Sequence, residues 1–308
     1  MGPAEEAIFR EVTFSTGSLG GLITSRQTSQ RATLKAHWWK ILISVVACTL
    51  VDVILHKLFA PRIEYNFPPS IFVEKGLFLV AASVALILWF GTLAIVFALI
   101  QDRLPGDRAM KGWRYGIAFG VLCFLAIFEM SLIFDSSAVD ELRTSSTDAI
   151  SILMLGVLLG RLAGTDSQYA GKQIKIGWRA IIPIPLAFLI GRYFGYGIVH
   201  IMSAYAQKPI ATLFWTLGIG WWIATTYFLL KEEDCKSSEI HALRFGVLIF
   251  GSYWLIYNLF VLVFVRVSVL DIFVRVIIDV LSVTVGTWVA DRLSRRKATV
   301  KMTERTHR

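Results

Sequence analysis

Long uninterrupted runs of apolar residues constrain this chain more than any other feature. A bilayer core about 30 Å thick is crossed by about 20 helical residues. Runs of 17 to 25 residues, each bounded by charged residues, occur eight times. We therefore predict an all-α fold, a polytopic bundle of transmembrane helices with about eight spans: 41–59, 77–100, 115–134, 144–160, 180–204, 209–230, 245–265 and 267–290. The fourth run is the shortest and contains Asp148, so a re-entrant segment stays open as an alternative.

The composition excludes an ordinary soluble protein. Of 308 residues, 56% are hydrophobic and only 17% are charged, against about 25% charged in soluble domains. The net charge of +9 does not indicate nucleic-acid binding, because basic residues alternate with apolar runs and do not gather on one polar domain. The three cysteines lack metal-site spacing, and no disulfide is implied.

The distribution of Lys and Arg predicts the orientation. With a cytoplasmic N-terminus, 23 basic residues fall on the inside and 6 on the outside, as the positive-inside rule requires. We expect a multi-pass protein of the plasma or inner membrane with both termini cytoplasmic. Residues 1–40 are interpreted as a cytoplasmic tail, with a targeting segment as the alternative, and residues 291–308 as a basic cytoplasmic tail.

Short motifs recur between 41–164 and 165–290, which we interpret as two halves with four spans each. An even number of spans gives both halves the same orientation, so the prediction is a parallel internal repeat. A larger bundle with no mechanistic meaning is the alternative. The matching segments, at shifts of 130 to 132 residues, are DAIS at 148 with DVLS at 279, RL at 161 with RL at 292, RYG at 114 with RFG at 244, and WF at 89 with WW at 221.

Ionisable residues inside the predicted spans are the candidates for function. Each unpaired charge at a helix centre costs about 2.5 to 3.5 kcal/mol, so these side chains must pair, lose their charge or face water. Two pairs have i, i+4 spacing and are expected to pair locally, Asp52 with His56 and Arg275 with Asp279. The candidates for a substrate or ion path are Asp52, His56, Glu129, Arg192, Arg275 and Asp279.

Two of these candidates, Glu129 and Arg192, have no partner on their own helix and must interact across the bundle. Matching depth in the two halves leads us to expect a contact between Asp52 and Arg192. Proline and glycine residues surround Arg192 in span 180–204. Such a helix can break at a binding site, although close packing of small residues explains the same pattern.

No phosphate-binding loop, nucleophile elbow or zinc-protease motif occurs. We therefore assign no catalytic residues, no metal and no cofactor, and favour a non-enzymatic role. The leading hypothesis is a transporter or permeation pathway for a small solute or ion, which proton movement could drive. The alternatives are a non-catalytic membrane component that binds a protein or lipid, and an intramembrane lipid-modifying enzyme. Expected partners are the lipid bilayer and a small solute or proton, but not nucleic acid.

Overall fold

The computed structural model describes residues 38–59, 67–166, 181–231 and 237–306, with side chains described up to residue 295. Residues 41–308 form one compact unit, and residues 1–40 form another, of which only 38–40 are described. Within the described ranges the regular structure is helical, apart from one isolated bridge between Pro69 and Val265. The two predicted tails lie almost wholly outside what can be described.

Among the described residues, five helices are long and apolar enough to cross a membrane, which bears out the all-helical fold and indicates a membrane-embedded protein. The predicted fourth span is part of a continuous 26-residue helix, which begins six residues earlier than expected. The five are the first helix Trp38–Phe59; α3 (Phe78–Ile100) with η1 (Gln101–Arg103); α4 (Arg108–Ile133); α5 (Ala138–Ala163); and Ser238–Val263, built from α8 (Ser238–Leu243), η4 (Arg244–Gly251), α9 (Ser252–Phe260) and η5 (Val261–Val263).

Three further helices coincide with predicted spans, but their crossing of the membrane stays a prediction. One is α6 (Pro183–Phe194), which continues into the π-helical turn η3 (Gly195–Val199) and is only 17 residues long with it. The expected extension to residue 204 is wrong, because His200 has a left-handed φ of 58° that ends the helix. The other two are α7 (Pro209–Leu229) and the 38-residue α10 (Val269–Thr306).

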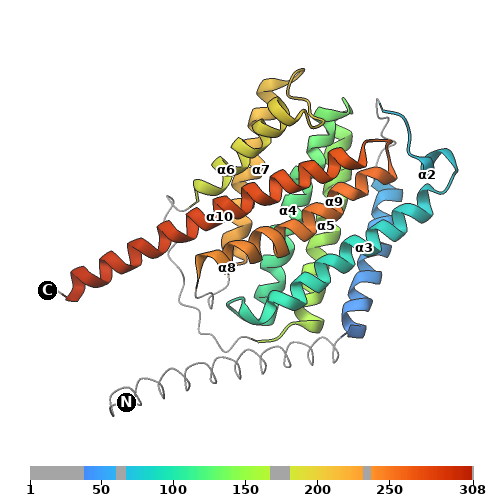
Figure 1. Cartoon of the computed structure of the whole chain (residues 1–308). Coiled ribbons are helices and arrows are strands. Elements are labelled where there is room, and N and C mark those ends of the chain that lie inside the picture. Colours follow the sequence, from blue (N-terminus) through green and yellow to red (C-terminus); the bar gives the residue numbers. More distant parts are fainter. Residues whose placement is uncertain (1–37, 60–66, 167–180, 232–236, 307–308) are drawn as a thin grey trace, which may run out of the picture. The chain divides into compact units, whose positions relative to one another are not determined.

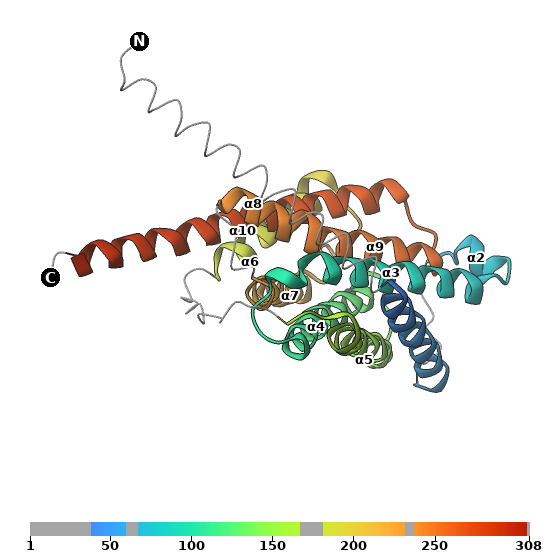
Figure 2. The same cartoon turned by 90° about the horizontal axis from the view of Figure 1, so that it is seen from below.

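Helices α4 and α5 lie side by side (Figures 1 and 2) and form the closest packing in the molecule. Glycines allow the two backbones to touch: a Cβ added to Gly112 would lie 2.4 Å from the carbonyl oxygen of Gly156, and one added to Gly160 would lie 2.8 Å from the Cα of Gly112. Small residues permit this approach in membrane helices. The α4–α5 pair is therefore a closely fitted unit that few larger side chains could enter.

The remaining helices lie to one side of this pair, which is at the edge of the bundle in Figure 2. Helix α10 packs along α6 and along the α8–α9 segment, while α7 packs against α4 and α6 (Figure 1). The first helix is covered least among the five candidate spans, with 28% of its apolar stretch buried against 56% in α4. The short helix α2 (Ile71–Glu74) is tied to the end of η5, where Ser70 Oγ donates to the Val263 carbonyl at 2.6 Å.

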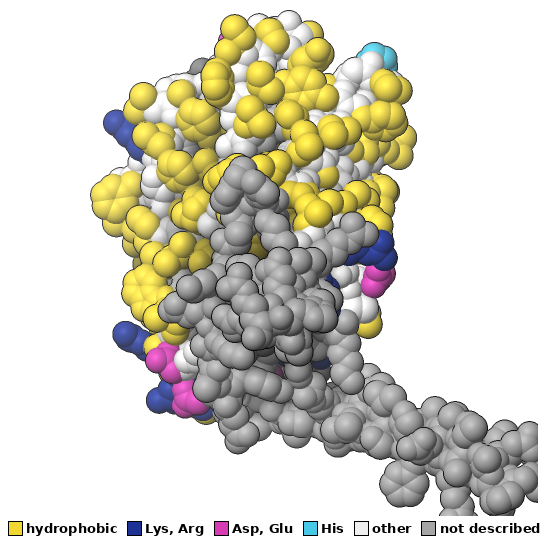
Figure 3. All heavy atoms as spheres, turned by 90° about the vertical axis from the view of Figure 1, so that its left-hand side faces the viewer, with side chains coloured by type: hydrophobic (Ala, Val, Ile, Leu, Met, Phe, Trp, Pro, Cys, Tyr) yellow, Lys and Arg dark blue, Asp and Glu magenta, His cyan; other side chains and the backbone are white. Residues whose placement is uncertain are grey.

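The outer surface is apolar, as contact with lipid requires. Figure 3 shows a face covered mainly by hydrophobic side chains, with Lys, Arg, Asp and Glu in small groups toward its edges. Large hydrophobic residues such as Leu79, Ile210 and Leu270 are more than half exposed. Exposed apolar area on this scale is abnormal for a soluble protein and fits a bilayer environment.

Candidate functional site

Three ionisable side chains from two helices meet in a buried cluster that we call the Asp–His–Asp triad. Asp52 and His56 extend from the first helix, and Asp148 extends from α5. The imidazole lies between the two acids: His56 Nδ1 is 3.4 Å from Asp52 Oδ2, and His56 Nε2 is 3.6 Å from Asp148 Oδ1. The two aspartate side chains are buried, while His56 is 31% exposed.

The triad forms part of the wall of a pocket of about 730 Å³. Ligand sites for small molecules usually measure about 300 to 1,000 Å³ and combine apolar walls with a few convergent polar groups. This pocket has that character. Its walls come from the first helix (Asp52, Val53, His56, Lys57), α3 (Phe78, Leu79, Ala82, Ser83, Leu86, Trp89), α4 (Ile127, Met130) with Phe134, α5 (Glu141, Thr144, Asp148) and α9–η5 (Tyr257, Phe260, Val261) with Phe264 and Val265.

Several polar atoms of this wall are buried without a hydrogen-bond partner among the described residues. They are both carboxylate oxygens of Asp52, Oε2 of Glu141, the hydroxyl of Thr144 and Nε1 of Trp89. The second oxygen of Glu141 accepts from Ser136 Oγ at 2.7 Å. Buried polar groups in native proteins almost always have partners. Such a concentration of unpaired atoms around one pocket indicates that something polar completes it.

Asp52, His56 and Asp148 are also the described residues most able to hold a metal ion, since one ligand atom from each lies within 4.8 Å of the others. The sequence does not predict this grouping, because Asp148 is far along the chain from Asp52 and His56. However, His56 presents a different nitrogen to each acid. A metal ion binds one ring nitrogen of a histidine, so both carboxylates would have to lie on the side of that nitrogen. The observed arrangement fits an imidazolium that donates from each nitrogen toward a different carboxylate better than it fits a metal site.

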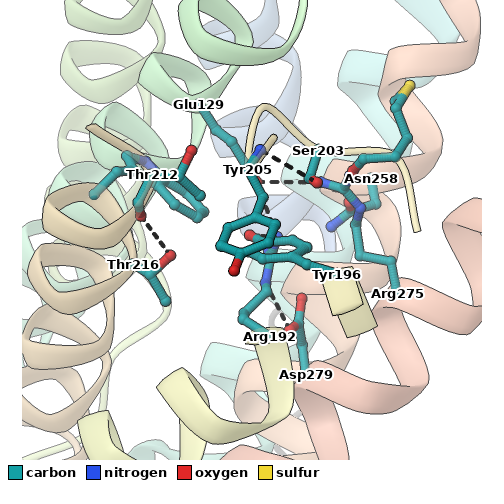
Figure 4. A network of polar contacts seen from close by, with 12 residues as sticks. Glu129, Arg192, Tyr196, Ser203, Tyr205, Thr212, Thr216, Asn258, Arg275 and Asp279 are labelled. Carbon is teal, nitrogen blue, oxygen red and sulfur yellow. Dashed lines mark hydrogen bonds and ion pairs between the residues drawn. The ribbon is translucent and has the colours of Figure 1, made fainter. Parts of the chain in front are cut away.

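A second cluster, the Arg192 network, lies at the junction of α4, α6 and α10 (Figure 4). Arg192 is fully buried and forms ion pairs with two acids: NH1 is 2.9 Å from Glu129 Oε1, and Nε is 2.8 Å from Asp279 Oδ1. Arg192 NH1 also donates to the hydroxyl of Tyr196 at 3.2 Å. Glu129 receives a second cation, Arg275, at 3.3 Å.

Aromatic rings and backbone groups complete the Arg192 network. The guanidinium carbon lies 5.2 Å from the ring centres of Phe188 and Trp215 and 5.7 Å from that of Trp254, within cation–π range. Trp254 Nε1 also donates to Asp279 Oδ2 at 2.7 Å, and Arg275 donates to the carbonyl of Met202. Here each acid faces a permanently charged guanidinium group at 2.8 to 3.3 Å, whereas the acids of the triad face a histidine at 3.4 and 3.6 Å.

The predicted pairings are confirmed in part. Arg192 does interact across the bundle with Glu129, and Asp52 does pair with His56 on its own helix. The expected contact between Asp52 and Arg192 is wrong, because each joins a different cluster. The expected local pair of Arg275 with Asp279 is also wrong: Asp279 turns to Arg192, and Arg275 turns to Glu129.

Asp148, Glu141 and Trp89 line the pocket, although none of the three is a candidate for the substrate or ion path by sequence. A signal for Asp148 was present, because it is the repeat counterpart of the candidate Asp279. Glu141 was placed outside the membrane because α5 begins earlier than the apolar run. Nothing in the sequence indicated that the Trp89 indole would lack a partner.

A third polar cluster surrounds Asp291, which directly follows the predicted eighth span. His241 Nδ1 lies 3.2 Å from Asp291 Oδ1, and Arg295 Nε lies 2.6 Å from Oδ2. Burial alone would raise the pKa of Asp291, but hydrogen bonds from His241, Arg295 and Ser238 outweigh burial and lower that pKa far below its ordinary range. This carboxylate therefore stays ionised, as a structural anchor does.

Comparison of the chain with protein families, with curated proteins and with solved structures gives no match. The two clusters and the pocket thus carry the functional interpretation by themselves.

Proposed function

We propose that this protein moves a small solute or ion across the membrane in a proton-linked manner, using the pocket beside the Asp–His–Asp triad. The observation that carries the proposal is the position of the triad: a titratable cluster forms part of the wall of a cavity of ligand size. Ionisable residues inside a membrane commonly belong to substrate paths and proton relays. Asp52 and His56, both predicted candidates, are central to this site.

The triad suits proton exchange because its three groups are too close to titrate independently. With ligand atoms within 4.8 Å of one another, the charge of each group depends on the others, and protons enter or leave the cluster as a unit. Two adjacent carboxylates oppose each other's ionisation unless a proton or cation lies between them. Other titratable side chains within electrostatic reach are Cys48, Cys123 and Glu141, and Lys57 lines the same pocket.

In this proposal the Arg192 network is a fixed junction and not a proton carrier. Three further candidates by sequence belong to this network. Glu129 pairs with the guanidinium groups of Arg192 and Arg275, and Asp279 pairs with that of Arg192. A guanidinium does not lose its proton in proteins. These residues hold α4, α6 and α10 together, while solute and protons use the triad. Eight spans with both termini cytoplasmic remain part of the proposal.

We also propose that the two halves arose by duplication, and equivalent helix contacts support this. On α4, Gly116 packs against Leu153 of α5. A shift of 130 or 131 residues leads to Gly246, which packs against Thr284 of α10. A second pair of contacts follows the shift of 131: Gly120 with Ala149, and Gly251 with Val280.

A related correspondence links the two ionic clusters. Asp148 corresponds to Asp279 at the shift of 131, and a shift of 139 between the first helix and α6 takes Asp52 to Gly191, the neighbour of Arg192. In the first half Asp148 faces His56, one turn from Asp52, and in the second half Asp279 faces Arg192. Duplication followed by such a change would leave one titratable cluster and one permanently charged cluster.

The test is solute-dependent proton movement in proteoliposomes that contain a pH-sensitive dye. A panel of small cations, anions and neutral solutes is added outside, and the internal pH is followed. For a transported member of the panel, we expect a pH change with the wild-type protein and none with Asp148→Asn or His56→Arg, since the first removes an acid and the second fixes the positive charge.

Asp140→Asn provides the matched control, because it makes the same change on the same helix at a residue that does not line the pocket. Its proton movement should equal that of the wild type. If no solute in the panel moves protons, or if Asp148→Asn transports normally, the proposed function is wrong.

A further inference from the structure

The polar atoms of the pocket favour a ligand that is positively charged. Three carboxyl groups line it, from Asp52, Glu141 and Asp148, against two basic side chains, His56 and Lys57. His56 already lies between two of the acids, whereas Oε2 of Glu141 has no hydrogen-bond partner among the described residues. An anion would meet this wall with repulsion and a cation with attraction.

The unpaired atoms further indicate that the ligand donates hydrogen bonds. The two oxygens of Asp52 and Oε2 of Glu141 can only accept hydrogen bonds when ionised, and the Thr144 hydroxyl can accept as well. An ammonium group supplies up to three N–H donors together with the charge. One such group would satisfy several atoms that are now buried and unpaired.

The rest of the pocket suits an apolar and aromatic body. Trp89, Tyr257 and Phe260 form one wall, with ring centres 5.8 Å (Trp89–Tyr257) and 5.4 Å (Trp89–Phe260) apart. Phe78, Leu86 and Ile127 add further apolar surface. Aromatic faces also attract a cation that lies near them. A ligand with a charged end and an apolar body matches both parts of the wall.

Part of the pocket wall on α3 is exposed. Leu79 on α3 lines the pocket and is 65% exposed, and the neighbouring Phe78 is also exposed. Apolar side chains exposed on a candidate span face lipid, so this side of the pocket is reached from the bilayer. An amphipathic ligand, which concentrates in the bilayer, would have direct access.

From these observations we propose that the pocket binds an amphipathic organic ammonium ion, with the ammonium group at Asp52, Asp148 and Glu141 and the apolar body against the aromatic wall. This inference rests on the proposed function for its meaning in transport, but the binding itself can be tested without transport.

The experiment measures binding by isothermal titration calorimetry, with the full-length protein in detergent micelles and protein-free micelles as the blank. The probe is 4-phenylbutylammonium, compared with 4-phenylbutanol and 4-phenylbutyrate, which have the same apolar body with neutral and negative ends. We expect the ammonium to bind at least about tenfold more tightly than either analogue. Equal affinities for the three compounds would overturn the proposal.

Two variants locate the binding. Asp148→Asn and Glu141→Gln should each weaken binding of 4-phenylbutylammonium by about tenfold, while Asp140→Asn, one residue from Glu141 and outside the pocket, should leave binding unchanged. If both pocket variants bind like the wild type, the site is elsewhere. The assignment of an organic ammonium ion to the pocket would also be overturned if Zn²⁺ binds the wild type and displaces 4-phenylbutylammonium at equal concentration.

A second measurement uses the wild type alone, in case the variants do not fold. A hydrophobic carbodiimide activates carboxyl groups as O-acylisoureas, and a bound 4-phenylbutylammonium that gives up its proton should displace the urea and form an amide with Asp52, Glu141 or Asp148, as mass spectrometry of the peptides can show. Amides found only on carboxyl groups outside the pocket would contradict the proposal. Tight binding without proton-linked transport would refute the proposed function alone, and transport of other solutes without this binding would refute only the ligand class.

Discussion

The two buried ionic clusters have the same plan and opposite chemistry. In each, a basic side chain lies between two carboxylates: His56 between Asp52 and Asp148, and Arg192 between Glu129 and Asp279. Around Arg192, three aromatic rings and the Trp254 indole complete the shell. Around His56, the neighbouring space is a pocket. The same arrangement of side chains is thus enclosed by aromatic rings around Arg192, whereas around His56 it borders a pocket.

In the proposed function, this difference separates a structural charge from a functional one. A permanent cation paired with two acids keeps its surroundings constant, because removal of any member leaves an uncompensated buried charge. A histidine between two acids can respond to protons or to a competing cation. Burial and pairing together, and not the mere presence of charge in a span, indicate which cluster changes state.

The largest expected effect concerns the two basic residues. Arg192→Met should lower the free energy of unfolding by about 3 to 5 kcal/mol, since Glu129 and Asp279 lose their main counter-ion. His56→Met should lower it by less than about 1 kcal/mol, because the imidazole is partly exposed. Denaturant unfolding of both variants in the same mixed micelles provides the measurement. Equal losses would mean that the two clusters do not differ in kind.

A smaller effect is expected for the acids. Asp279→Asn should destabilise the protein by about 2 to 3 kcal/mol, because it weakens the ion pair with Arg192 and the bond from Trp254. Asp52→Asn should change stability by no more than about 1 kcal/mol, because Asp52 Oδ2 faces the partly exposed His56 at 3.4 Å and neither carboxylate oxygen accepts a hydrogen bond. Both variants are compared by the same unfolding measurement. A large loss for Asp52→Asn would show that its carboxylate is needed for folding.

The smallest expected effect is the pH dependence of stability, for which Asp291 in the third cluster serves as a fixed reference for Asp148 in the triad. Because the pKa of Asp291 is lowered in the folded protein, its contribution to stability is complete above its unfolded pKa of about 3.9 and is lost only as the pH falls toward the folded value. Because histidine ordinarily changes charge between pH 5 and 8, the comparison is made without the imidazole of His241, which contacts Asp291. The difference in melting temperature between His241→Gln and the double variant His241→Gln with Asp291→Asn should then stay constant from pH 5 to 8. For Asp148→Asn in the coupled triad, the corresponding difference should vary with pH. A pH-dependent effect of Asp291→Asn would contradict the assignment of this residue as a fixed anchor.

Much of the fold could be predicted from hydropathy because apolar length determines which segments become helices in a bilayer. The run at 209–230 differs from α7 by a single residue. Where polar residues extend a helix beyond the apolar core, the prediction fell short, and α5 begins six residues before the expected span. The left-handed conformation of His200, which ends η3, has no signal in hydropathy.

The candidate site could be predicted less well, because sequence fixes the depth of a residue but not the rotation of its helix. Depth placed all six candidates in one layer, and the lack of a local partner for Glu129 and Arg192 predicted contacts of both across the bundle, which they make with each other. Depth also suggested the contact of Asp52 with Arg192, but the two residues face different neighbours. The pocket depends on side chains from five segments of the chain, and no local pattern records how they meet.

The sparse packing of the first helix has a consequence for how binding could be transmitted. Two members of the triad belong to this helix, the least buried of the candidate spans, and the third belongs to the tightly fitted α4–α5 pair. Local opening costs least where few apolar contacts hold an element. A ligand shifts a conformational equilibrium only as far as its affinity for the two states differs. In the proposed function, a proton or ammonium ion that binds at Asp52 and Asp148 beside His56 would hold the loosely packed first helix against the rigid α4–α5 pair, and amide hydrogen exchange in the first helix would slow while the ion is bound.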